Sequence, residues 1–209
     1  MRRRPLSRTR GFTLIELLVV IAMMAIIILI SFPAIDRMLH RGKIEGAART
    51  TKAMMQVARL ESIKRSLPVL VQADFDQKQV IAFTDMNNSG GLFEDGTDRL
   101  LSSMRLSRGI FFHGEEDNDP EGPNALINFD SNTCSGCPAG GWVQFNPDGS
   151  ASMVGAIRLA DARGNFLEVA VTTMATAKVE IRKHDPVNDL YYVQGEVQRG
   201  TKAITWEWF

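Results

Sequence analysis

One carboxylate lies inside a long apolar run near the start of this chain. The run covers residues 12–32 and contains 21 residues, of which three are polar: Thr13, Glu16 and Ser31. A charged side chain at the centre of a membrane-spanning helix costs about 2.5–3.5 kcal/mol on insertion scales, and such residues usually have a partner. We therefore interpret Glu16 as a group that pairs with a positive charge inside the membrane. The alternative is that it reaches the aqueous surface close to its end of the run.

The only two cysteines, Cys134 and Cys137, are separated by Ser-Gly in a segment rich in glycine and proline. A disulfide is favoured if this part of the chain lies outside the cytoplasm, where thiols are oxidised. Free thiols are an alternative. Zinc or redox chemistry is disfavoured, because a structural zinc site needs about four ligands and only two thiols are present.

Residues 85–95 place oxygen-bearing side chains at intervals before a glycine, a spacing that resembles a calcium loop. The candidate ligands are Asp85, Asn87, Ser89 and Asp95. Gly96 occupies the twelfth position, where such a loop has glutamate, and no flanking helices are evident. A bent loop with Asx turns is the alternative.

Nothing else in the sequence forms a catalytic pattern. The three histidines are scattered, and no nucleophile elbow, zinc-protease or phosphate-loop motif is present. We therefore expect no enzymatic activity and no cofactor beyond calcium. The overall balance of 24 basic and 24 acidic residues gives no sign of a dedicated nucleic-acid binder.

The elements that position Glu16 begin with a basic leader, residues 1–11, which contains five arginines and no acid. Residues 12–34 are long enough to span a bilayer as a helix. The positive-inside rule then predicts a cytoplasmic N-terminus and a translocated C-terminal part. Removal of the leader would leave 19 basic and 24 acidic side chains, a formal balance of −5.

Residues 35–67 predict an amphipathic continuation of the helix up to Pro68. Pro33 lacks an amide hydrogen and predicts a kink or local melting near the membrane exit. Glu45 and Arg49 are spaced for an ion pair within one turn. The predicted core-facing stripe follows helical spacing: Ile44, Ala47, Ala48, Thr51, Met54, Met55, Ala58 and Ser62.

Residues 68–209 predict a β-rich domain, since short alternating segments are separated by glycine, proline and asparagine turns. The fold expected is α+β, with the long helix packed on an antiparallel, sandwich-like domain. Trp206 and Trp208 are expected to complete its core. The predicted strands are 69–74, 79–84, 109–112, 125–129, 142–146, 150–159, 166–173, 177–184, 190–197 and 202–209.

Residues 11–16, Gly-Phe-Thr-Leu-Ile-Glu, resemble the class III signal of type IV prepilins. The resemblance implies cleavage by a prepilin peptidase between Gly11 and Phe12, and methylation of the new Phe12 amine. It implies that Glu16 pairs with the N-terminal amine of a neighbouring subunit in a filament. It also implies that the helix near Pro33 unwinds locally during assembly.

The stretch 142–151, followed by 157–159 and 179–182, resembles the GspH/FimT family of minor pseudopilins and pilins, most clearly at 145–149, Phe-Asn-Pro-Asp-Gly. Residues 85–140 have no counterpart in that resemblance. The family often has Gly-Arg before a late strand, whereas residues 176–178 here read Thr-Ala-Lys. This difference weakens any transfer of the DNA-binding role proposed for some members.

The resemblance implies a minor pseudopilin of a type II secretion system, anchored in the inner membrane by a single span, with its β-rich domain in the periplasm. Its partners would be the prepilin peptidase, other pseudopilins or pilins, and the inner-membrane assembly platform. The alternative is a FimT-like minor pilin that acts in pilus priming, adhesion or DNA uptake. A membrane-anchored periplasmic enzyme is a third hypothesis, and no motif supports it.

Overall fold

The computed structural model describes residues 12–87, 93–94, 96–112, 140–185, 190–194 and 206. The chain divides into two compact units, Met1–Leu39 and His40–Phe209. The predictions for residues 125–129, Trp208 and the two cysteines lie outside the described residues.

Helix α1, Leu14–Arg65, contributes residues to both units. Its backbone remains helical through Pro33, so of the two predicted alternatives the single chain shows no local melting there, and the kink stays a prediction. All eight residues of the predicted stripe are buried, from Ile44 to Ser62. Glu45 pairs with Arg49 as expected, at 3.6 Å, and more closely with Arg41, at 2.8 Å.

The second unit contains two antiparallel sheets. The first has the order β3-β2-β1-β5, and the second has the order β4-β6-β7-β8-β9. The strands of the first sheet are β1 Val69–Asp74, β2 Gln79–Thr84, β3 Arg99–Arg105 and β5 Gly140–Phe145. Those of the second are β4 Ile110–Phe112, β6 Gly155–Asp161, β7 Phe166–Thr173, β8 Lys178–Asp185 and β9 Leu190–Val193.

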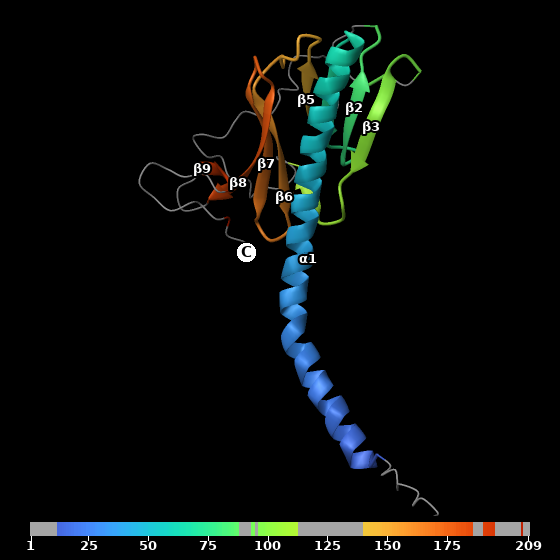
Figure 1. Cartoon of the computed structure of the whole chain (residues 1–209), viewed down its shortest axis with the longest axis vertical. Coiled ribbons are helices and arrows are strands. Elements are labelled where there is room, and N and C mark those ends of the chain that lie inside the picture. The colour runs from blue at the N-terminus through green and yellow to red at the C-terminus, as the bar shows by residue number, and fades with distance from the viewer. Residues whose placement is uncertain are drawn as a thin grey trace, which may run out of the picture. The chain divides into compact units, whose positions relative to one another are not determined.

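One core joins the helix and both sheets. Within the second unit, α1 lies across the sheets, with β2 and β3 on one side of it and β7 and β8 on the other (Figure 1). The core includes Met55 of α1, Val71 of β1 and Val169 of β7, all fully buried. Trp206 packs against the same core, as predicted. The predicted α+β architecture is therefore confirmed.

Several strand boundaries differ from the predictions, and two of the differences are large. The segment predicted at 150–159 forms β6 only from Gly155, because Ala151 makes an isolated bridge to Phe145 and residues 152–154 are irregular. Strand β3 was not predicted at all. It is an edge strand whose side chains are mostly exposed, and it contains no β-branched residue, so its residues give neither strand propensity nor a buried alternation.

Candidate functional site

The beginning of α1 forms a reciprocal cap. Glu16 Oε2 accepts hydrogen bonds from the Thr13 amide and the Thr13 hydroxyl, both at 2.9 Å. The Glu16 amide donates in return to Thr13 Oγ1 at 3.3 Å. Thr13 and Glu16 therefore form the capping box that a threonine and a glutamate three residues apart can make at a helix start. The sequence predicted Glu16 to pair with another subunit or to reach the aqueous surface, and this local role was missed.

The cap leaves part of the carboxylate available. Both bonds from Thr13 use Oε2, and Glu16 Oε1 has no hydrogen bond to any of the residues that the structure describes. An ionised carboxylate has about four acceptor positions on its two oxygens. The side chain can therefore hold the helix end and accept a second donor at the same time.

The rest of this segment exposes apolar surface all around the helix. The residues from Leu14 to Phe32 include large side chains that are 42–81% exposed, without a buried stripe. The helix is long and apolar enough to cross a membrane by length and composition. A helix that is apolar on every side is stable only when other apolar groups surround it.

The two remaining candidate sites lie largely outside the described residues. Cys134 and Cys137 are both outside them, as are Ser89 and Asp95. Asp85 is buried, and Asn87 Nδ2 donates to Glu94 Oε2 at 3.1 Å. Within the part of the chain that the structure describes, no three His, Cys, Asp or Glu side chains are grouped to hold a metal. Calcium binding and the disulfide stay predictions.

The second unit has a groove of about 390 Å³ between α1 and strands β7 to β9. Its lining includes the apolar side chains of Ile181 and Trp206 and the charged side chains of Arg49, Lys52 and Glu180. Glu180 is already paired with Lys178 at 2.7 Å. The groove brings together no described nucleophile and base.

Sequence reasoning also missed a buried charge cluster on the second sheet. The register places Arg158 of β6, Glu168 of β7 and Arg182 of β8 in one row. Glu168 is fully buried and lies 3.4 Å from Arg158 Nε and 3.4 Å from Arg182 Nη1. Burial raises the pKa of Glu168, and the two arginines oppose that rise. The Arg158 guanidinium also lies 5.0 Å from the ring of Tyr191.

Known proteins match the two parts of the chain to different degrees. Residues 6–32 match the family described as "Prokaryotic N-terminal methylation motif". The chain therefore has a prepilin-type N-terminus, which confirms the prediction from residues 11–16. No curated protein matches the sequence significantly.

Two solved structures of the minor pseudopilin EpsH, from the Type 2 Secretion System of Vibrio cholerae, are similar to this chain. The first has a TM-score of 0.43 and 9% identity, and the similarity covers 66% of this chain and 95% of that one. The second has a TM-score of 0.39 and 11% identity, with coverage of 66% and 92%.

Proposed function

We propose that this chain is a minor pseudopilin of a type II secretion system, cut after Gly11, methylated at Phe12 and assembled into a periplasmic pseudopilus for protein export. The observation that supports it most is the methylation motif at residues 6–32, which contains the capped Glu16 and the apolar first part of the membrane-length helix. The resemblance of residues 145–149 to the GspH/FimT family favours the secretion system. The protein acts mechanically, and we propose no enzymatic activity.

Assembly begins at the new amine. Cleavage places a positive charge on Phe12, directly before the cap of α1. Glu16 Oε2 keeps the Thr13 amide satisfied, and Oε1 accepts the amine of the neighbouring subunit. A charge-assisted hydrogen bond of this kind is about twice as strong as a neutral one. The pair therefore aligns one helix with the next in the apolar layer, where an unpaired carboxylate would be costly.

The test separates the cap from the charge with two substitutions, Glu16→Gln and Glu16→Ala. Glutamine can still cap the helix at this position, whereas alanine cannot. Both variants are expected to insert normally and to be lost from the purified filament, with secretion falling in parallel. Incorporation of Glu16→Gln at the wild-type level would show that the charge is not needed. An intact mass of the mature chain checks cleavage and methylation in every variant.

Pro33 contributes to assembly by weakening the helix locally. It cannot donate the hydrogen bond to the carbonyl four residues earlier. Pro33→Ala is therefore expected to leave membrane insertion unchanged and to slow incorporation into the filament, measured as the fraction of chain in pelleted pseudopili. Equal incorporation of both forms would remove Pro33 from the assembly step.

The location that follows is a single inner-membrane span with the second unit in the periplasm. Its partners are the prepilin peptidase, the other pseudopilins and the inner-membrane assembly platform. The alternative, a FimT-like minor pilin, predicts pilus or competence genes beside this one and retardation of DNA by the chain at physiological salt. Phosphate contacts are salt-sensitive, so binding seen only at low salt does not support that alternative.

Two chemical properties complete the proposal. Cys134 and Cys137 form a disulfide in the periplasm, so both resist alkylation until a reductant is added. Calcium binding by residues 85–95 would appear as saturable uptake in equilibrium dialysis, and it would be lost on Asp85→Asn.

A further inference from the structure

Many basic side chains lie at one end of the second unit, the end at which the chain enters it. We call these side chains the basic end. Helix α1 is followed after two residues by Pro68 and β1, so the Val69 end of the first sheet lies beside the end of the helix. The opposite end of the sheets therefore lies toward His40, where the second unit begins. The basic end comprises Arg41, Lys43, Lys78, Arg105, Arg108 and Arg163.

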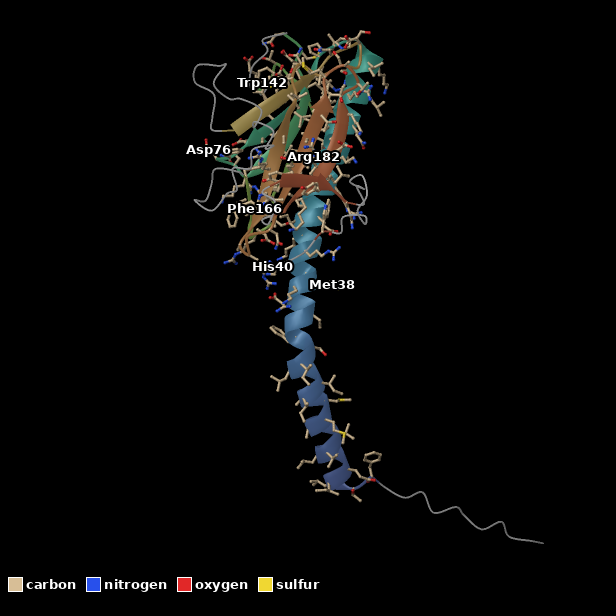
Figure 2. All side chains as sticks on the ribbon, turned by 90° about the vertical axis from the view of Figure 1, so that its left-hand side faces the viewer. Met38, His40, Asp76, Trp142, Phe166 and Arg182 are labelled. Carbon is tan, nitrogen blue, oxygen red and sulfur yellow. The ribbon has the colours of Figure 1, made fainter. Side chains whose placement is uncertain are left out.

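Backbone contacts bring its loops together. The Leu106 amide donates to the Lys78 carbonyl at 2.8 Å, which joins the β1–β2 turn to the end of β3. Ile110 pairs with Asp161, so Arg108 and Arg163 each lie two residues beyond one strand pair. Figure 1 shows the β3–β4 connection and the β6–β7 turn at the same end of the sheets, level with the first part of α1 in this unit. Phe166, directly after that turn, lies toward His40 and away from Trp142 (Figure 2).

The carboxylates at this end are mostly engaged. Asp74 accepts the Gln77 amide at 2.9 Å, and Glu45 pairs with Arg41. Asp161 is buried, and it accepts the amides of residues 163 and 165, each at 2.9 Å. Asp76 is the exposed carboxylate of the β1–β2 turn.

Three cations of the basic end have uncompensated charge. Lys43, Arg105 and Arg108 are exposed, and none forms an ion pair with any residue that the structure describes. At the other end of the sheets, the loop after β2 and the β5–β6 turn carry four carboxylates: Asp85, Glu94, Asp98 and Asp148. The cations near that end are Lys64 and Arg65, both paired with Glu61; Arg59, which donates to the Gly149 carbonyl at 2.9 Å; and the exposed Arg99. The unit is therefore more positive where the membrane anchor joins it.

We infer that the basic end binds anionic phospholipid headgroups and holds the second unit at the membrane surface before assembly. The inference rests on the proposed function in one respect, namely that residues 12–34 span a membrane. Five residues, 35–39, connect that span to the second unit, and they rise about 8 Å as a helix. This length is close to the distance over which charges act at physiological salt, about 8 Å.

Lipid is favoured over other anionic partners because the anchor supplies it at all times. A soluble partner must first diffuse to the site, whereas a tethered surface is always at high effective concentration. Each lysine or arginine near an anionic leaflet shifts the contact equilibrium about fivefold, and the shift weakens within a Debye length. Removal of two arginines is therefore expected to reduce the contact about 25-fold at low salt.

The experiment uses the full processed chain in nanodiscs of phosphatidylcholine, with or without phosphatidylglycerol. Amide hydrogen exchange is followed in peptides covering residues 105–110 and 161–165. Phosphatidylglycerol is expected to slow exchange in both segments, and added salt is expected to remove the effect. The double variant Arg105→Gln, Arg108→Gln should lose the slowing. Arg99→Gln is the matched control, because Arg99 is an exposed arginine at the other end of the same strand.

Three outcomes would overturn the inference. Equal exchange in neutral and anionic discs at low salt would show that the basic end does not bind lipid. Slowing that depends on the number of chains per disc, and not on lipid charge, would assign the surface to another subunit. Slowing that needs added duplex DNA would assign it to nucleic acid. Failure of the chain to enter either disc would instead refute the membrane anchor, and with it the proposed function.

Discussion

Replacement of the buried glutamate tests whether the charge row of the second sheet stabilises the fold. In Glu168→Gln the side chain keeps its shape and loses its charge. Arg158, whose side chain is 4% exposed, and Arg182 then each lose a counter-charge at 3.4 Å. Loss of one partner from a buried ion pair costs about 3–5 kcal/mol.

The size of the expected effect follows from the length of the chain. For a domain of this size, each kcal/mol lowers the melting temperature by about 2–4 °C, so Glu168→Gln should lower it by about 6–20 °C. Near-ultraviolet circular dichroism of the full chain in nanodiscs measures the transition. Glu180→Gln is the control, because Glu180 lies on the adjacent strand in a partly exposed pair with Lys178, and loss of such a pair costs about 1 kcal/mol or less.

Two results would refute this reasoning. A melting temperature within about 2 °C of wild type would mean that Arg158 finds solvent or another acceptor when the glutamate is neutral. A higher melting temperature would mean that desolvation of Glu168 outweighs its attraction to both arginines. Either result would remove the row as a source of stability.

Two further substitutions test local geometry. Thr13→Ala removes the hydroxyl of the helix cap, which should weaken the helix start by about 0.5–2 kcal/mol and speed amide exchange in residues 14–17, and unchanged exchange would contradict the cap. Gly149→Ala should lower the melting temperature, because Gly149 has φ 83° and a Cβ there would lie 3.1 Å from Ile63 Cδ1. The left-handed backbone alone costs about 1–2 kcal/mol for a non-glycine residue, so an unchanged melting temperature would show that this turn relaxes freely.

Helical and turn features could be predicted because they depend on neighbouring residues. The stripe of α1 repeats with the helical period, and every member is buried. Strand β1 begins directly after Pro68, and the observed bounds Val69–Asp74 are those predicted. The turn at Gly149 was predicted from Pro-Asp-Gly, and the Gly149 amide closes it by donating to Asn146 O at 2.9 Å.

The features that sequence reasoning missed depend on distant partners. Arg158, Glu168 and Arg182 alternate with core residues along their strands, and alternating charged residues normally face solvent. Only the three-strand register brings them into one row, and only the tertiary structure buries that row. Their matching positions on strands β6 to β8 were visible in the sequence, but no local signal distinguishes a buried row from an exposed one. Strand β3 was missed for a related reason, since an exposed edge strand needs little apolar patterning.

The two units should also differ in what stabilises them. The buried core begins at Ile44, and the apolar side chains of residues 14–32 are exposed in the isolated chain. A chain of residues 40–209 therefore retains the described core and should fold without the anchor. The new helix start lacks a cap, which costs about 1 kcal/mol and lowers the melting temperature by about 2–4 °C. A cooperative transition in that range, measured for the truncated chain in buffer, supports this division. Absence of a transition would mean that the second unit depends on the anchor, so that folding and membrane insertion are coupled.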